Sequence, residues 1–275
     1  MKKRVPFALR RLRFIQRNFN ERPRVREMLT RLLYGSGDRD VRMFGREVRI
    51  DALRESGYYR ASKLARANSL LRDETLVLQR VSMMLGPNTT FVDIGANIGI
   101  FSCVIADAAR LFDNFRVVAF EASPDTYRRL SINAERFGFT AINAALAASD
   151  GPLDFADGAV SGIATVSAKA GVAHIPGRGF VAQGRRLDGF DLPGRLVFKI
   201  DVEGMELAVL EGARGLFDHG QVAAVYLDEF TDRPAVLAFL AGYGFDLYAP
   251  TRLPKYHDRA RALLAVRRGD TRGTS

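Results

Sequence analysis

FVDIGANIGIF, at residues 91–101, is the stretch that decides the fold of this chain. It begins with a short apolar run, residues 91–94, which is typical of a buried strand. A turn containing Gly95 and Gly99 then leads into apolar residues at helical spacing. Because glycine has no Cβ, this turn can approach a bound molecule closely. With Asp93 just before the turn, the stretch predicts a strand, a ligand-binding loop and a helix in succession.

Apolar strands alternate with helical patterns from this stretch onward. The predicted strands cover residues 91–94, 116–120, 140–146, 196–202, 222–227, 245–248 and 263–266. Ser123, Pro124 and Gly138 mark the two ends of one intervening helix. Such alternation is typical of a mostly parallel sheet with helices on both faces. We therefore expect an α/β fold with a doubly wound, mostly parallel seven-stranded sheet.

Glu121 ends the second predicted strand, 22 residues beyond Gly99. In a doubly wound sheet a carboxylate at this position can accept hydrogen bonds from both hydroxyls of a ribose. The spacing Asp93-x-Gly95-x-x-x-Gly99 lacks the first close glycine pair of the dinucleotide motif, whose loop binds a pyrophosphate. S-Adenosylmethionine has a ribose and an amino-acid end but no pyrophosphate. The sequence therefore favours S-adenosylmethionine over NAD as the cofactor.

A second motif, LVFKIDVEGMELAVLEGA at residues 196–213, places acidic residues at the end of the fourth predicted strand. Ligands of open α/β sheets bind beyond the carboxyl ends of the strands, so these acids should face the same crevice. Asp201 and Glu203 are therefore the candidates for the catalytic base of a methyl transfer to a hydroxyl, or for the group that orients the acceptor. Glu206 and Lys199 have two interpretations: a role in the site, or a helix-starting carboxylate and an ordinary ion pair.

These motifs carry a family resemblance. VDIGANIGIFS, AFEASPDTYRRLSINAERFG, the AASD of residues 147–150 and KIDVEGMELAVLEGA resemble the FkbM family of S-adenosylmethionine-dependent methyltransferases. The resemblance covers roughly residues 74–250. It implies a class I, Rossmann-like methyltransferase fold and an O-methyltransferase activity on the hydroxyl of a sugar, glycan or natural product.

The resemblance also implies the cofactor-binding residues. These are Asp93, Gly95 and Gly99 at the methionine end, Asn97 in the same loop, Glu121 at the ribose, and Ser149 and Asp150 at the adenine. The chain departs from the family at residues 121–124, where Glu-Ala-Ser-Pro stands in place of the frequent Glu-Pro-Asn-Pro. Since the acid and the helix-starting proline are kept, S-adenosylmethionine remains the expected cofactor. The acceptor, a small molecule or a glycan, is left open.

The net charge of +10 is unevenly distributed over the 275 residues. Residues 1–72 contain 20 Lys and Arg against 7 Asp and Glu, whereas residues 73–275 contain 21 bases and 24 acids. We expect a basic amphipathic helical arm over residues 1–34, a small hairpin and helical cap over 35–72, and the methyltransferase domain over 73–275. The arm has three interpretations: a helix without a partner, a helix on an anionic membrane surface or, less favoured, a nucleic-acid-binding segment.

Two alternative functions use this arm. The first is an RNA methyltransferase that binds phosphates through the arm, and the second is a non-catalytic membrane adaptor that retains a cofactor pocket. The longest stretches without a charge have 13 residues, fewer than the about 20 that a membrane-spanning helix needs. A single cysteine cannot form an intramolecular disulfide. We expect a cytoplasmic location, peripheral to the inner face of a membrane if the arm binds lipid.

The remaining candidate residues carry weaker signals. Glu229 follows the fifth strand and suits either the ligand-facing edge or a solvated loop. His174, His219 and His257 lack ligand spacing, so no metal site is expected, and Cys103 suits an apolar core. Residues 151–194 are rich in glycine and polar side chains, and predict a hairpin turning at 157–158 and a mobile connection over 171–184.

Overall fold

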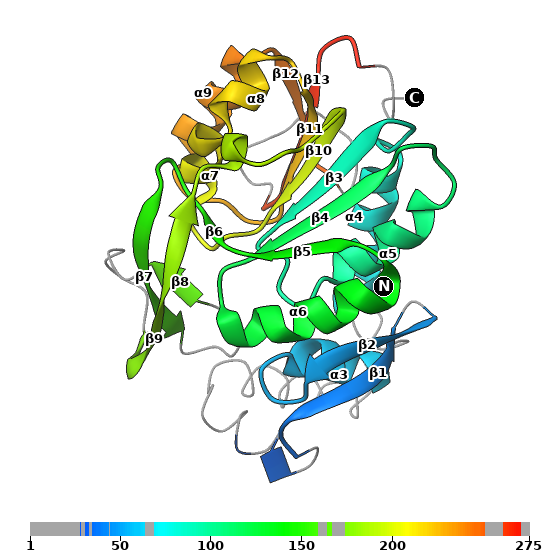
Figure 1. The fold of residues 1–275 in the computed structure, drawn as a ribbon, viewed down its shortest axis with the longest axis vertical. Helices are drawn as coiled ribbons and strands as arrows, with labels where there is room; N and C mark the ends of the chain where they lie inside the picture. The colour runs from blue at the N-terminus through cyan, green and yellow to red at the C-terminus, as the bar shows by residue number, and fades with distance from the viewer. Residues whose placement is uncertain are drawn as a thin grey trace, which may run out of the picture.

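A seven-stranded sheet forms the centre of the computed structural model (Figure 1). Its strands are β3 (Thr89–Ile94), β4 (Arg116–Glu121), β5 (Thr140–Asn143), β10 (Arg195–Ile200), β11 (Val222–Leu227), β12 (Phe245–Tyr248) and β13 (Leu263–Arg267). They lie in the order β12-β13-β11-β10-β3-β4-β5, with β13 antiparallel to both of its neighbours and the others parallel. The predicted mostly parallel sheet is therefore confirmed. The structure describes residues 28, 31–32, 35–43, 45–63, 69–158, 164–166, 174–250 and 261–270.

Helices cover both faces of this sheet, as the doubly wound prediction requires. They are α4 (Ser69–Ser82), α5 (Ile100–Ala109), α6 (Pro124–Phe137), α7 (Glu206–Gly212), α8 (Arg214–Asp218) and α9 (Arg233–Gly242). Ile105 of α5 belongs to one apolar core and Phe217 of α8 to another. Neighbouring strand residues point to opposite cores, since Val197 of β10 joins the first and Phe198 the second. The strands are therefore buried on both sides, as parallel strands usually are.

Helix α6 begins and ends where the sequence predicts. The Ser123 hydroxyl accepts a hydrogen bond from the Thr126 amide, and Pro124 occupies the first turn, where no backbone donor is needed. Gly138 ends the helix in the left-handed conformation, with φ of 77°. Between these ends, Leu130 and Ala134 are among the buried residues of the helix. Local signals at both ends thus fix the helix that follows Glu121.

The predicted N-terminal hairpin is confirmed and belongs to the main core. β1 (Asp38–Met43) pairs antiparallel with β2 (Arg46–Asp51), and their inward residues join the core of α5. Asn133 of α6 holds the hairpin, because its Oδ1 accepts from the Arg49 amide at 2.7 Å and its Nδ2 donates to the Arg49 carbonyl at 3.1 Å. Two helices follow the hairpin, α3 (Ser56–Lys63) and α4.

A second, four-stranded sheet corrects the prediction for the glycine-rich region. It comprises β6 (Ala145–Leu146), β7 (Gly151–Gly158), β8 (Ala164–Val166) and β9 (His174–Arg185), in the order β6-β9-β7-β8. A hairpin is present as β7–β8, but it does not turn at 157–158, because both residues belong to β7 and Asp157 pairs with Ala164. The expected mobile connection is wrong for residues 174–184, because residues 174–185 form β9 and pair antiparallel with β7. Alternating inward residues of β9, such as Phe180 and Ala182, pack on β7 and outweigh the turn signal of its glycines.

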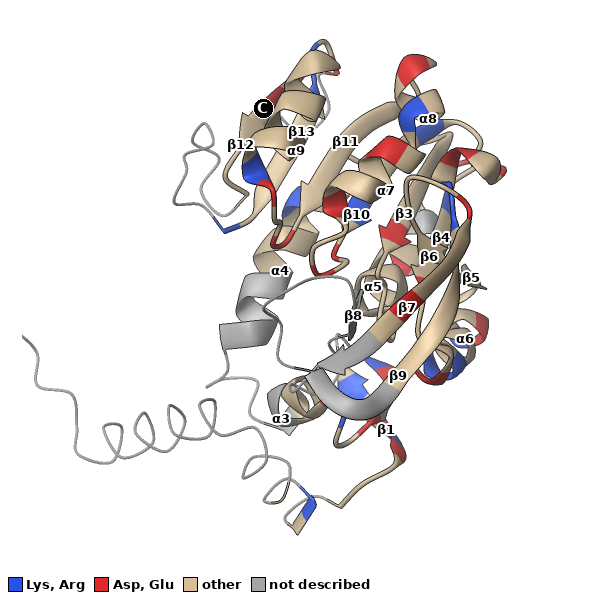
Figure 2. Ribbon diagram, turned by 90° about the vertical axis from the view of Figure 1, so that its left-hand side faces the viewer, with Lys and Arg blue, Asp and Glu red and all other residues tan. Residues whose placement is uncertain are grey.

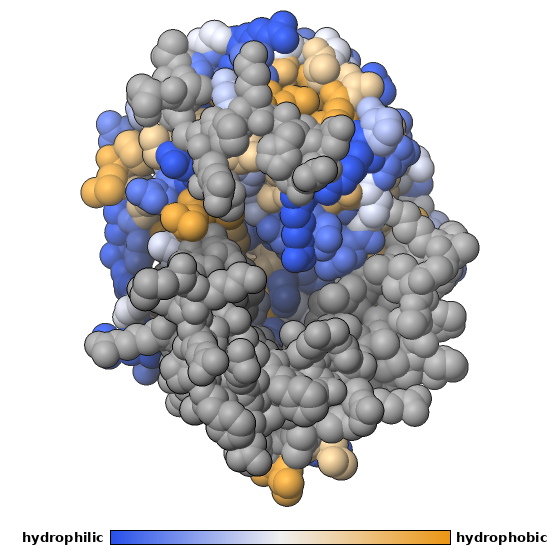
Figure 3. All heavy atoms as spheres, turned by 180° about the vertical axis from the view of Figure 1, so that it is seen from behind, coloured by the Kyte–Doolittle hydropathy of each residue, from blue (hydrophilic) through white to orange (hydrophobic). Residues whose placement is uncertain are grey.

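The surface of the described residues carries no large apolar patch on the face of Figure 3, where hydrophobic side chains stand in small separate groups. Among the described residues, Leu111 and Val181 are the most exposed large hydrophobic side chains apart from Leu32. No helix in this part of the chain is long and apolar enough to cross a membrane. Most of the predicted basic arm, residues 1–27, lies outside the described residues.

A buried ion pair joins the N-terminal segment to α6. The Arg129 guanidinium donates to the Glu55 carboxylate at 3.0 Å, and both side chains are almost completely buried. The other Glu55 oxygen accepts from the Asp51 amide at 2.6 Å. Burial raises the pKa of Glu55, although Arg129 opposes this effect. The contact therefore fixes the end of the hairpin against α6, the helix that also packs against Gly99.

Replacing Glu55 with alanine should lower the free energy of unfolding by about 3 kcal/mol, because it leaves the Arg129 charge buried without its carboxylate. Denaturant unfolding of purified protein would measure the change. Asp246→Ala is the matched control, since Asp246 pairs with Arg268 on the exposed surface and should contribute less than about 1 kcal/mol. Equal losses in the two variants would contradict a stabilising role for the buried pair.

Candidate active site

The candidate site lies at the carboxyl ends of four neighbouring strands. The loops after β3, β4, β10 and β11 begin at Gly95, Ala122, Asp201 and Asp228, and the parallel pairing of these strands brings the loops to one edge. Figure 2 shows acidic residues gathered around the ends of β10 and β11. Ligands of open α/β sheets bind at this edge, which agrees with the position predicted from the sequence.

The buried ammonium group of Lys199 connects two of these loops. Its Nζ donates to the Gly95 carbonyl at 2.9 Å and lies 3.2 Å from Asp93 Oδ1 and 3.5 Å from Asp201 Oδ2. Asp93 is only 1% exposed, and its other oxygen accepts from the Ser102 hydroxyl at 2.8 Å. Asp93 therefore holds Lys199 and α5 from beneath the loop, while its predicted contact with the cofactor stays a prediction. Of the two interpretations of Lys199, the described contacts agree with an ion pair, which it forms with Asp93 and Asp201.

Gly95 and Gly99 are required by contacts within the protein. Gly95 has φ of 70°, and a Cβ there would lie 2.0 Å from the Asp201 carbonyl oxygen. Gly99 has φ of 81°, and a Cβ there would lie 2.6 Å from a methyl carbon of Leu130. The missing side chain at Gly95 thus allows the glycine loop to touch the acidic loop directly. Sequence spacing could not indicate this, because Gly95 and Asp201 are far apart along the chain.

Glu121 faces the glycine loop from the end of β4. Its two carboxylate oxygens accept hydrogen bonds from the backbone amides of Asn97 at 3.0 Å and Ser123 at 2.9 Å. Burial raises the pKa of Glu121, while these amides and the charge of Lys199 act in the opposite direction. The two bonds fix the carboxylate in place and leave further lone pairs for a ligand.

Asn97 provides an unsatisfied polar atom in the same loop. The residue adopts a left-handed backbone conformation with φ of 52°. Its Oδ1 is buried and has no hydrogen-bond partner among the described residues. Buried polar atoms are usually paired, so this oxygen suits a donor from a bound molecule. The observation agrees with the prediction that Asn97 contacts the cofactor.

Asp201 and Glu203 stand next to each other on the opposite loop. Burial raises the pKa of Asp201, and Lys199 partly offsets the effect. Desolvation of its carboxyl raises the pKa of Glu203 to about 7, and the charges of Asp201, Glu229 and Glu206 act in the same direction. Glu203 also has φ of 47°, a strained conformation for a residue with a side chain. The loop thus holds a carboxyl group that exchanges its proton near neutral pH.

The sequence allows two roles for Glu206, a role in the site or that of a helix-starting carboxylate. The described contacts agree with the second, structural role. Its carboxylate is buried and accepts hydrogen bonds from the Gly204 amide, the Thr231 amide and the Thr231 hydroxyl. It stands at the first position of α7, where the helix dipole stabilises negative charge. Glu206 therefore ties the loop after β10 to the loop after β11. Thr231, its partner, carries no motif that would have singled it out in the sequence.

The other predicted residues lie apart from this cluster. Ser149 and Asp150 are exposed, and Asp150 accepts from the Arg186 amide at 2.8 Å; their adenine contact stays a prediction. Glu229 forms an exposed ion pair with Arg261 at 2.8 Å, yet lies close enough to raise the pKa of Glu203. His219 contacts the Gly215 carbonyl, His257 lies outside the described residues, and the described part of the chain contains no group of three or more metal-ligating side chains.

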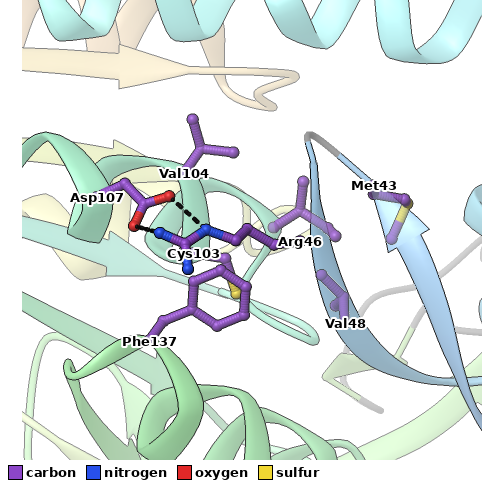
Figure 4. Close-up of a pocket in the computed structure, with 8 residues that line it drawn as sticks. Met43, Arg46, Val48, Cys103, Val104, Asp107 and Phe137 are labelled. Carbon is purple, nitrogen blue, oxygen red and sulfur yellow. Dashed lines mark hydrogen bonds and ion pairs between the residues drawn. The ribbon is translucent and has the colours of Figure 1, made fainter.

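Two hollows elsewhere do not coincide with the site. A cavity of about 40 Å³ between the hairpin, α5 and α6 is lined by Cys103 and by the Arg46–Asp107 ion pair, among other residues (Figure 4). It has room for only a few water molecules, and burial raises the pKa of the Cys103 thiol far above its usual value. A wider hollow of about 490 Å³ is lined by Pro193 and Gln221, which precede β10 and β11 and so lie at the opposite edge of the sheet.

Comparison with known proteins finds methyltransferases that resemble this chain. The hexuronic acid methyltransferase AglP of Haloferax volcanii is 32% identical over 148 residues, which are 52% of this chain and 57% of that protein. A solved methyltransferase FkbM from Methylobacillus flagellatus is 17% identical with a TM-score of 0.42, covering 66% of this chain and 43% of its own. A TehB-like S-adenosylmethionine-dependent methyltransferase from Corynebacterium glutamicum is 12% identical with a TM-score of 0.44, covering 78% and 97%.

This chain therefore spans little more than half the length of the curated relative that it matches. The sequence model of the methyltransferase FkbM domain matches residues 93–247, from the aspartate before the glycine loop to the strand β12. The match includes Glu121, Asp201 and Glu203 together with the four-stranded sheet. Because it covers more than half of the chain, this protein belongs to the FkbM methyltransferase domain family.

Proposed function

We propose that this protein transfers the methyl group of S-adenosylmethionine to a hydroxyl of a sugar or glycan. The observation that carries the proposal is the contact of Gly95 with Asp201, which sets the glycine loop directly against the loop that bears the acids. Membership of the FkbM methyltransferase domain family supports methyl transfer. The relative named for hexuronic acid methylation supports an acceptor of the carbohydrate class.

The residues of the glycine loop and of β4 fit this cofactor. Glu121 would hold the ribose through the lone pairs that its two backbone bonds leave open, and Asn97 Oδ1 would accept from a donor of the amino-acid end. When bound, S-adenosylmethionine supplies a methyl group on a positively charged sulfur. The carboxylates of this edge favour a positive charge electrostatically, and Lys199 compensates only part of their charge.

Glu203 is the proposed catalytic base, and Asp201 orients the acceptor. A hydroxyl that receives a methyl group must lose its proton, and a base works best when its pKa lies near the working pH. Glu203, with a pKa of about 7, meets this condition. Asp201 is held by Lys199, so its carboxylate has a fixed position from which it accepts the acceptor's hydrogen bond. Holding the two reacting groups in line contributes most of the acceleration.

The roles first considered for residues 1–34 stay predictions, as does the cytoplasmic location. The RNA methyltransferase and the membrane adaptor both depend on this arm, most of which lies outside the described residues. In the described part of the chain, Arg46 of the hairpin pairs with Asp107 of α5, while Asp40 and Glu55 pair with Arg136 and Arg129 of α6. These described arginines of the hairpin and of α6 are thus engaged in ion pairs within the protein.

Incubation with methyl-labelled S-adenosylmethionine and fractionated cell extract tests the proposed function. Label should appear in a carbohydrate fraction as an alkali-stable methyl ether, because an ether resists hydrolysis whereas a methyl ester does not. Label in RNA would support the first alternative, and label in no fraction, with the cofactor bound, would support the adaptor. Either result would refute glycan O-methylation.

Replacing Glu121 with alanine should weaken S-adenosylmethionine binding about 100-fold, since two hydrogen bonds to a charged group are lost. Isothermal calorimetry measures the change. Glu121→Gln should give an intermediate loss, and Glu135→Ala, an exposed acid on α6, should bind the cofactor normally. Unchanged affinity in Glu121→Ala would remove the ribose assignment.

The pH dependence of kcat/KM should report the base. Because the deprotonated form of Glu203 accepts the proton, the rate should rise with pH and level off above about 7. In Glu203→Gln, this pH-dependent rise (the acidic limb of the profile) should be absent, and methyl transfer should be about 100-fold slower or more. Glu229→Gln removes a negative charge that raises the pKa of Glu203, so the limb should move to lower pH while the plateau is kept. A limb that stays in place in both variants would exclude Glu203 as the base.

A further inference from the structure

The four-stranded sheet rests directly on the two loops that form the candidate site. One face of β7 and β9 forms a small apolar cluster, in which Phe155 and Ala182 are buried and Phe180 is half-buried. Ala122 and Met205 pack against this cluster. Ala122 directly follows Glu121, and Met205 is two residues beyond Glu203. The cluster therefore touches the predicted cofactor side and the predicted acceptor side of the same crevice.

Two aromatic rings give this face a fixed, flat surface. Phe155 and Phe180 are directly paired across β7 and β9, and their rings stack with centroids 5.0 Å apart and planes 3° apart. Phe155 is 8% exposed, so it backs the ring of Phe180, which keeps part of its surface accessible. A ring that is already held by its neighbour loses little freedom when a ligand covers it.

Side chains along β7 and β9 alternate between the two faces of the sheet, so the face that carries Phe180 is opposite to the solvent-exposed face. Val181 follows Phe180 on β9 and is 62% exposed, because its side chain points to the opposite face. Asp154, its partner on β7, is exposed as well. The face that carries Phe180 is thus distinguished from the solvent face by its neighbours Ala122 and Met205.

We propose that Phe180, backed by Phe155, is the platform on which the acceptor lies, and that the acceptor group is a pyranose ring. The inference rests on the proposed function and names the acceptor surface of that same site. A pyranose presents aliphatic C–H groups on its faces and hydroxyls around its edge. Met205 of the acid-bearing loop packs against the cluster that contains Phe180, so one acceptor can meet both kinds of surface. In this proposal the aromatic ring receives the C–H face, and the carboxyls of Asp201 and Glu203 receive the hydroxyl edge.

Saturation-transfer NMR on the full chain with bound S-adenosylhomocysteine tests this platform, with methyl β-D-glucopyranoside as the probe. All ring hydrogens of this sugar are axial, so a stacked ring should receive saturation mainly on the hydrogens of one face. Sorbitol has similar hydroxyls but no ring face, and should receive several-fold less. Phe180→Ala should weaken binding of the glucoside about tenfold, which corresponds to about 1.4 kcal/mol.

Two further variants keep the test decisive. Phe180→Leu retains an apolar contact with Phe155 but removes the flat ring, and should lose the one-face pattern even if Phe180→Ala does not fold. Val181→Ala changes the opposite face of the same strand and should retain the pattern. Thermal unfolding and calorimetry with S-adenosylhomocysteine verify that each variant is folded and binds the cofactor product.

The failure of this inference differs from the failure of the proposed function. If the unmodified protein binds S-adenosylhomocysteine but transfers no saturation to the glucoside, or if Phe180→Leu behaves like Val181→Ala, the platform is wrong while methyl transfer is untouched. If the protein binds neither S-adenosylhomocysteine nor S-adenosylmethionine, the proposed function itself fails. A one-face pattern that Phe180→Leu abolishes and Val181→Ala keeps supports the platform.

Discussion

At the centre of the site, the buried ammonium of Lys199 bonds the Gly95 carbonyl and lies between the carboxylates of Asp93 and Asp201. A charge in this position would cost several kcal/mol if it lacked partners, so the loops that supply them are held at fixed positions. The Asp201 carbonyl in turn occupies the space that a side chain at residue 95 would need. The glycine loop and the acid-bearing loop are therefore fixed relative to each other by contacts within the protein.

Much of the fold could be predicted because its signals are local. Ser123, Pro124 and Gly138 act within one helix, and the apolar runs of β3 and β10 identify buried strands without knowledge of their partners. The strand β9 was missed for the opposite reason. Its glycines resemble a loop, and only its pairing with β7 and the stacking of Phe180 on Phe155 give it a strand's environment. Contacts of this kind depend on residues that are distant in sequence.

The candidate site shows the same division. The acids at the ends of β4 and β10 could be assigned to one edge because parallel strands align their carboxyl ends. The roles of Lys199 and Thr231 could not be assigned, since each depends on a backbone position set by another loop. Gly95 was correctly singled out, but the described contacts add a reason of their own: the close approach of Asp201. The types of residue thus indicated which chemical groups the site contains. Only the three-dimensional structure shows which contacts hold these groups in position.

The four-stranded sheet contributes no strand to the central seven, although it packs against the loops that follow β4 and β10. In the proposed function, the residues that hold the cofactor follow β3 and β4, whereas the four-stranded sheet adds a contact surface for the acceptor to the acids that follow β10. Mutations over residues 151–185 can accumulate without disturbing the ladder between β3, β4 and β10. The proposed function therefore implies that changes in this sheet can alter the acceptor while the residues proposed to hold the methyl donor stay the same.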